Sequence, residues 1–201
     1  MITEVVLEAM NHTSVWSWIS TLSSILYIVG ASRGKVWCWP VGIVGSAAAI
    51  VEYYYQQLPA ESVLNGIYVI LGFSGWYMWL KQKQTSKNIF TVKTCTASQL
   101  QLVLFISLVG GFTLGFISTT YNWSNYPYID SVLAGSSVAA TWLTTKRYIE
   151  NWIFWIIIDG ASVVLYIHKG PEMYLFAILF FIFTVLSIRG LISWKRQLSN
   201  A

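Results

Sequence analysis

The chain has 201 residues, of which 56% are hydrophobic and 10% are charged, with a mean hydropathy of +0.59 and a formal net charge of +4. A soluble globular domain has about 25% charged residues, so this composition excludes a soluble domain and indicates a protein surrounded by lipid. The basic residues stand at the ends of apolar runs and form no basic face, which excludes a nucleic-acid-binding module. The two histidines and two cysteines form no cluster, so no metal site or cofactor is predicted.

A bilayer crossing needs about 20 predominantly apolar residues. The N-terminal residues, Thr3 to Glu8, carry acids where a signal peptide would carry positive charge, and we expect them outside the bilayer. No soluble domain fits between the apolar runs, so a single all-α membrane domain is predicted over residues 1–201. Its seven transmembrane helices are expected at 15–31, 37–56, 62–80, 99–119, 128–144, 151–168 and 173–193.

The loop charges predict the orientation of the chain. With the N-terminus outside and the C-terminus inside, only Lys169 is basic on the outer side. This bias agrees with the positive-inside rule. The residues that fall on the inner side are Arg33, Lys35, Lys81, Lys83, Lys87, Lys93, Lys146, Arg147, Lys195 and Arg196.

Similar residues recur at nearly one offset in the two halves of the chain. These matches predict two parallel three-helix repeats, at 15–80 and 128–194, joined by a linker helix at 99–119 that restores the orientation of the second copy. Parallel repeats occur in transporters, although a purely structural bundle would give the same pattern. The matched pairs are Trp39 with Trp155 and Ser46 with Ser162, both 116 apart, and Gly75 with Gly190 and Trp79 with Trp194, both 115 apart.

The sixth apolar segment places a carboxylate on an aromatic and polar helix face. Trp152, Trp155, Asp159, Ser162 and Tyr166 follow each other at spacings of three or four, so they share one face. A carboxylate that faces hydrocarbon costs about 2.5–3.5 kcal/mol. Asp159 is therefore predicted to face the bundle interior or a watery cavity and to contribute to function.

Other helices offer Trp39, Asn65, Tyr68 and Asp130 to the same predicted site. Flat indole walls with few charges suit a planar heterocycle, especially a cationic one. Asp130 could instead be solvated at the outer helix end, and Trp152 and Trp155 could be interfacial anchors. Interfacial anchoring is the favoured interpretation for Trp16, Trp18, Trp79, Trp123 and Trp194, which lie near helix ends.

Two stretches, "GWYMW" and "TKRYIENWIFWIIIDGASVVLY", resemble the PnuC family of bacterial vitamin transporters, with an Asn-Trp-x-x-Trp core at Asn151, Trp152 and Trp155. The resemblance covers nearly the whole chain. It implies a fused pair of SWEET-like three-helix bundles in the inner membrane. It also implies facilitated diffusion of an unphosphorylated vitamin, which a cytosolic kinase then traps. The absence of a Gly-x-x-x-x-Gly-Lys-Ser/Thr motif agrees with transport that does not use ATP.

The substrate is predicted from three positions. In this family, members for nicotinamide riboside typically have Gln at the place of Asn65, Asn at the place of Gly72 and Asn at the place of Asp159. An ionised carboxylate only accepts hydrogen bonds and suits the exocyclic amine of an aminopyrimidine. Thiamine, carried by the PnuT branch, is therefore the favoured substrate, with nicotinamide riboside and then riboflavin as alternatives.

Two other classes of function stay open: an intramembrane enzyme and a structural membrane subunit. An enzyme would need a second catalytic group beside Asp159, and the sequence offers none, so no catalytic residues are predicted. A homo-oligomer is compatible with the sequence, which does not decide the oligomeric state.

Overall fold

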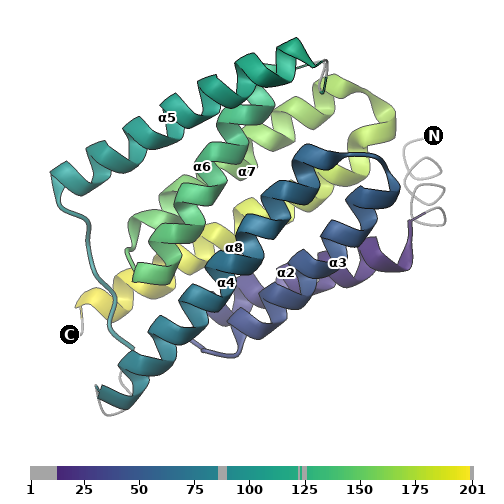
Figure 1. Cartoon of the computed structure of the whole chain (residues 1–201). Helices are drawn as coiled ribbons and strands as arrows, with labels where there is room; N and C mark the ends of the chain where they lie inside the picture. Colours follow the sequence, from purple (N-terminus) through teal and green to yellow (C-terminus); the bar gives the residue numbers. More distant parts are fainter. Residues whose placement is uncertain (1–12, 86–89, 122, 124–125, 200–201) are drawn as a thin grey trace.

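The computed structural model describes residues 13–85, 90–121, 123 and 126–199, and this part of the chain is all-helical (Figure 1). Each predicted apolar run falls on one helix, which confirms the all-helical fold. The helices are α2 (Val15–Ser32), α3 (Cys38–Tyr55), α4 (Pro59–Thr85), α5 (Ala97–Thr120), α6 (Pro127–Lys146), α7 (Glu150–Lys169) and α8 (Tyr174–Ser199), with a short 3₁₀ helix, Pro171–Met173, before α8. The prediction that Thr3 to Glu8 lie outside the bilayer falls on residues outside the described part.

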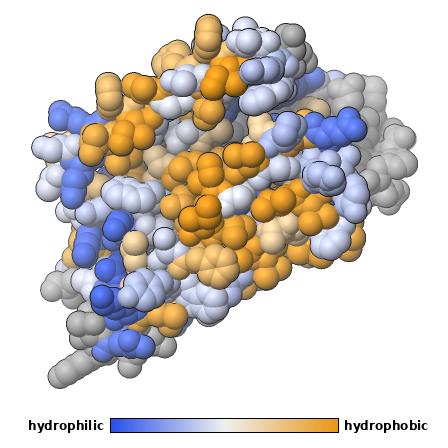
Figure 2. Space-filling view, in the orientation of Figure 1, coloured by the Kyte–Doolittle hydropathy of each residue, from blue (hydrophilic) through white to orange (hydrophobic). Residues whose placement is uncertain are grey.

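Among the described residues, five helices are long and apolar enough to cross a membrane: α2, α4 over Pro59–Gln82, α5, α7 and α8. The other two, α3 and α6, pack against neighbours on several sides, α3 against α2 and α4, and α6 against α4, α5 and α7. Figure 2 shows hydrophobic residues gathered across the middle of one face, with hydrophilic residues toward its ends, as expected for a protein in a bilayer.

Local signals fix several helix ends. The Ser14 side chain accepts a hydrogen bond from the backbone N–H of Ser17, and Thr96 with Gln99 forms a capping box at the start of α5. Helix α6 ends at Lys146, and its C-cap residue Arg147 has a left-handed backbone with φ of 63°. Because α7 begins at Glu150, only a short connection separates α6 from α7.

The helix contacts of the two halves correspond. Within the first half α2 packs on α3 and α3 on α4, and within the second half α6 packs on α7 and α7 on α8. The halves meet where α4 packs on α6 and where α2 packs on α8. In both contacts the third helix of one half packs on the first helix of the other half. Among the described helices, α5 packs on α6 alone, at the edge of the bundle (Figure 1). The predicted three-plus-one-plus-three repeat requires this pattern.

Four buried tryptophans form the core near one end of the bundle. Trp39 meets Trp79 edge to face with ring centroids 5.3 Å apart, and Trp152 meets Trp194 in the same way at 5.4 Å. All four have at most 2% of their surface exposed. The interfacial anchoring predicted for Trp79 and Trp194 is therefore wrong, because both indoles pack between helices instead of facing the membrane surface.

Glycines allow these indoles to approach the helix backbone. A Cβ atom at Gly75 would lie 2.3 Å from a ring carbon of Trp39, and one at Gly190 would lie 2.5 Å from a ring carbon of Trp152. Trp39 therefore corresponds by its contacts to Trp152, 113 residues later, and not to Trp155, 116 residues later, as the sequence comparison proposed. The two Gly-x-x-x-Trp pairs keep the offset of 115.

The indole N–H groups also join the two halves. Trp79 of α4 donates to the backbone oxygens of Thr144 and Thr145 in α6, at 3.3 and 3.2 Å. Trp194 of α8 donates to the backbone oxygen of Ala31 in α2, at 3.0 Å. Each half thus ends in an indole that is bound to the first helix of the other half.

Candidate substrate-binding site

Asp159 lies inside the helix bundle. Its side chain is 2% exposed, and its Oδ2 accepts a hydrogen bond of 3.3 Å from the hydroxyl of Ser187 on α8. The interior position predicted for this acid is confirmed. A buried carboxyl group that accepts from one neutral hydroxyl among the described residues still has acceptor capacity, so it could accept from a ligand donor.

Tyr68 brings the first half of the chain to this acid. Its hydroxyl is hydrogen-bonded to the hydroxyl of Ser137 on α6, and it interacts electrostatically with both Asp159 and Tyr53. Tyr68 and Tyr53 come from α4 and α3, whereas Ser137 and Asp159 come from α6 and α7. Both halves therefore contribute polar groups to one interior region.

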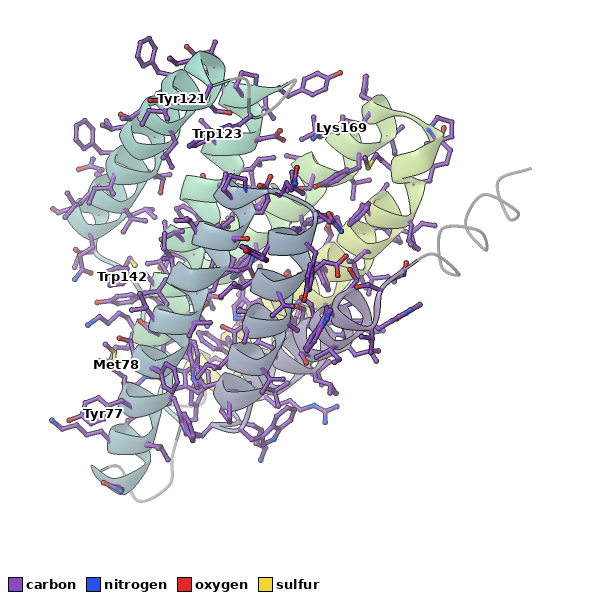
Figure 3. All side chains as sticks on the ribbon, turned by 45° about the vertical axis from the view of Figure 1, so that its right-hand side comes forward. Tyr77, Met78, Tyr121, Trp123, Trp142 and Lys169 are labelled. Carbon is purple, nitrogen blue, oxygen red and sulfur yellow. The ribbon has the colours of Figure 1, made fainter. Side chains whose placement is uncertain are left out.

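Tyr166 extends this region toward the end of the bundle that carries Lys169 (Figure 3). Its ring is stacked on Phe180, with ring centroids 5.3 Å apart, and the ammonium of Lys169 lies 5.1 Å from its centroid. Lys169 also forms a salt bridge of 3.3 Å with Asp130. Tyr166 also interacts electrostatically with Tyr53 and Asp130, so it belongs with Asp159 and Tyr68 to one polar and aromatic series.

Three further predicted residues lie along α4 and α7. Asn65 donates to the backbone oxygen of Glu61 at 2.9 Å, which turns its amide toward its own helix. Ser162 is buried, one turn beyond Asp159, and Trp155 is partly exposed, one turn before it. Trp155 is not part of the buried tryptophan cluster, so its ring is not held in that packing.

The Asn-Trp-x-x-Trp core divides into two parts. Asn151 is fully buried and ties the start of α7 to α6, because its Oδ1 accepts from the Thr144 hydroxyl at 3.1 Å. Trp152 packs on Gly190 and Trp194. These contacts give Asn151 and Trp152 a packing role, as the matching contacts do for Trp39. Binding by Trp39 and Trp152 stays a prediction that no contact described here tests.

Sequence reasoning missed Ser187, and it placed Tyr53 and Ser137 on helix faces that could line the site without naming them as site residues. Ser187 had a detectable signal: it lies three residues before Gly190 and seven before Trp194, on one helix face. Ser137 and Tyr53 stood on polar stripes of their helices, but only the tertiary contacts bring them to Tyr68 and Tyr166. Within the described residues, no group of three His, Cys, Asp or Glu side chains could hold a metal ion.

Known proteins resemble this chain over most of its length. The family model described as "Nicotinamide mononucleotide transporter" matches residues 14–196. The nicotinamide riboside transporter PnuC of Escherichia coli K12 is 26% identical over 207 residues, covering 89% of this chain and 85% of the relative. The PnuC proteins of Neisseria mucosa and Haemophilus influenzae are 26% and 25% identical, covering 96% and 90% of this chain and 76% and 80% of the relatives.

The crystal structure of a vitamin B3 transporter PnuC has the same fold, with a TM-score of 0.74 at 24% identity, covering 99% of this chain and 90% of that one. The names of these relatives give no support to thiamine, and they favour nicotinamide riboside, the first alternative. Because the family model covers nearly the entire chain, this protein belongs to the nicotinamide mononucleotide transporter family and is a multi-pass protein of the bacterial inner membrane.

Proposed function

We propose that this protein carries nicotinamide riboside across the inner membrane by facilitated diffusion. The observation that carries the proposal is the family match over residues 14–196, together with relatives that are named nicotinamide riboside transporters. The polar and aromatic series between the two halves supports it, because transporters built from repeats hold their substrates near the repeat interface.

The chemistry of Asp159 fits nicotinamide riboside as well as thiamine. The nicotinamide ring of the riboside is a planar cation with a carboxamide, and the amide N–H groups can donate to a carboxyl oxygen. An ionised carboxylate at Asp159 would also attract a cationic ring nearby. The sequence argument for thiamine therefore depended on a feature that both vitamins share, namely a donor next to a cationic ring.

Trp155 and Tyr68 complete the proposed site. The partly exposed Trp155 ring would stack on the nicotinamide ring, a cation–π contact of about 0.5–2 kcal/mol. Tyr68, which is hydrogen-bonded to Ser137 and close to Asp159, would contact the substrate from the opposite half. Asp130, Lys169 and Tyr166 would then form the outer entrance to the site.

Uptake into liposomes tests this proposal. Purified protein should equilibrate labelled nicotinamide riboside, and unlabelled nicotinamide riboside should compete better than thiamine or riboflavin. Asp159→Ala should reduce uptake, while Trp16→Ala, which changes an exposed indole at the first helix, is the matched control. Uptake of thiamine without uptake of nicotinamide riboside would restore the first interpretation of the sequence.

Two further experiments test the mechanism. An imposed sodium or proton gradient should leave the final internal concentration unchanged, because diffusion without coupling only equalises the two sides. Enclosing a nicotinamide riboside kinase and ATP should then produce accumulation, since the phosphorylated product is trapped. Accumulation driven by an ion gradient in the absence of the kinase would contradict facilitated diffusion.

A further inference from the structure

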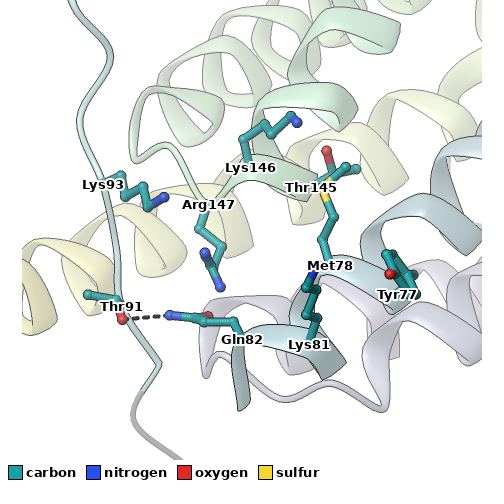
Figure 4. Close-up of a pocket in the computed structure, with 9 residues that line it drawn as sticks. All are labelled: Tyr77, Met78, Lys81, Gln82, Thr91, Lys93, Thr145, Lys146 and Arg147. Atoms are coloured by element: carbon teal, nitrogen blue, oxygen red, sulfur yellow. Dashed lines mark hydrogen bonds between the residues drawn. The ribbon is translucent and has the colours of Figure 1, made fainter. Parts of the chain in front are cut away.

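A hollow lies at the opposite end of the bundle from Lys169. It is a pocket of about 580 Å³ formed by the end of α4, the segment 90–93 and the turn between α6 and α7 (Figure 4). Tyr77 and Met78 stand on this side of the molecule, far along α4 from the entrance described above (Figure 3). The lining residues are Tyr77, Met78, Lys81, Gln82, Thr91, Lys93, Thr145, Lys146 and Arg147.

The lining of this pocket is strongly cationic. Four of its nine residues, Lys81, Lys93, Lys146 and Arg147, are basic, and none is acidic. The neighbouring acid Glu150 accepts a hydrogen bond from the backbone N–H of Cys95 instead, at 3.0 Å. The summed field in the pocket therefore attracts anions.

Arg147 gives the pocket an unsatisfied binding group. Its Nε and Nη1 atoms are buried and have no hydrogen-bond partner among the described residues, and burial lowers the pKa of this guanidinium. Leaving buried donors of a charged group unpaired costs free energy. An anionic oxygen could accept a charge-assisted hydrogen bond from either of these nitrogens.

The walls of the pocket are held by backbone bonds. The Lys93 N–H donates to the Arg147 oxygen, and the Ile149 N–H donates to the Lys93 oxygen, both at 2.9 Å. Across the pocket, Gln82 donates to the hydroxyl of Thr91 at 2.5 Å (Figure 4). These bonds fix the frame of the pocket without using the guanidinium of Arg147.

We propose that this pocket binds the phosphate group of an anionic phospholipid at the membrane surface. The apolar span of α4 ends at Gln82, which places the pocket at headgroup depth. Beside it, Tyr77 and Trp142 are 66% and 37% exposed and offer contacts for a glycerol backbone and acyl chains. Basic pockets between transmembrane helices bind lipid headgroups in this way. The positive-inside rule explains why basic residues gather at this end. It does not explain why two guanidinium nitrogens of Arg147 are buried without a hydrogen-bond partner among the described residues.

Native mass spectrometry of the purified chain in detergent tests the proposal. Phosphatidylglycerol should bind in preference to phosphatidylcholine. Arg147→Gln should weaken that binding about tenfold or more, as expected when a charge-assisted contact is lost, and Lys93→Gln about fivefold. Arg33→Gln is the matched control, because Arg33 caps α2 as Arg147 caps α6 but is exposed outside the pocket, and it should change binding less than twofold.

The competing outcomes are distinct. Equal losses for Arg33→Gln and Arg147→Gln would show that lipid is attracted by general surface charge, and this would overturn the site. Inorganic phosphate or a nucleoside monophosphate that displaces the lipid at equal concentration would show a site for soluble phosphate compounds, which would overturn the lipid assignment. Circular dichroism of each variant checks the fold, and a change in lipid binding without a change in helix content supports the proposal.

Discussion

Replacing Gly75 with alanine would place a methyl group against the Trp39 ring. The added Cβ would lie 2.3, 2.4 and 2.5 Å from three ring carbons of Trp39. The indole has little room to move, because it is packed edge to face against Tyr27 and Trp79, at centroid distances of 5.6 and 5.3 Å. Overpacking of this kind costs about 1–3 kcal/mol.

The same helix supplies the control. A Cβ atom at Gly66 would meet no heavy atom within 4 Å, so Gly66→Ala should only gain the helix propensity of alanine, about 1 kcal/mol. Since both substitutions in α4 share that gain, the difference between them measures the clash alone. We expect Gly75→Ala to be less stable than Gly66→Ala by about 1–3 kcal/mol.

Unfolding of the purified variants by SDS in mixed micelles, followed by circular dichroism, would measure this difference. The second half offers a replicate, because Gly190 contacts Trp152 while a Cβ atom at Gly160 would be in open space. If Gly75→Ala were as stable as Gly66→Ala, the Trp39 ring would be free to move, and the rigid packing that we assign to the tryptophan cluster would be refuted.

Three other changes test the site and its surroundings. Trp155→Ala should weaken nicotinamide riboside binding by about 1–3 kcal/mol if the ring stacks on the substrate; unchanged affinity by calorimetry would rule out stacking. Asp159→Ala should weaken binding by about 1–3 kcal/mol, whereas Asp159→Asn, which introduces the amide that the family resemblance gives to nicotinamide riboside members, should bind nicotinamide riboside at least as tightly as the parent; equal affinity of Asp159→Ala and the parent would remove Asp159 from the site. Burial and the charge of Glu150 raise the pKa of the Cys95 thiol to about 12, so Glu150→Gln should lower this pKa, increase the thiolate fraction and speed alkylation by iodoacetamide at pH 8. The buried Cys38, with 0% exposure, should give little background, and an unchanged rate would contradict the influence of Glu150.

The sequence predicted the helices well because lipid imposes a simple rule on their composition. Each apolar run became a helix, but α4 runs on to Thr85 although its apolar segment ends near residue 80. A helix continues as long as its backbone hydrogen bonds continue, and polar residues such as Lys81 can extend it beyond the bilayer. Hydropathy therefore located the helices better than their ends.

The interior contacts were harder to predict. Matching short strings paired Trp39 with Trp155, whereas packing on Gly75 and Gly190 pairs Trp39 with Trp152. Two indoles three residues apart on one helix face cannot be distinguished by spacing, and only their neighbours on other helices decide which is packed. The burial of Asp159 was predictable because a carboxylate in lipid is costly, but its Ser187 partner on α8 depends on how two helices cross.

The reciprocal indole bonds bear on how such a chain could have arisen. In an isologous dimer a residue i of one subunit contacts j of the other, and j contacts i in return. The bonds from Trp79 to α6 and from Trp194 to α2 follow that rule within one polypeptide. A three-helix ancestor with the same indole would have completed its fold only by pairing with a second copy of itself. Fusion of the genes through α5 would then have made that pairing independent of concentration and left each half free to diverge, as the contrast between Ser46 and Asp159, 113 residues apart, illustrates.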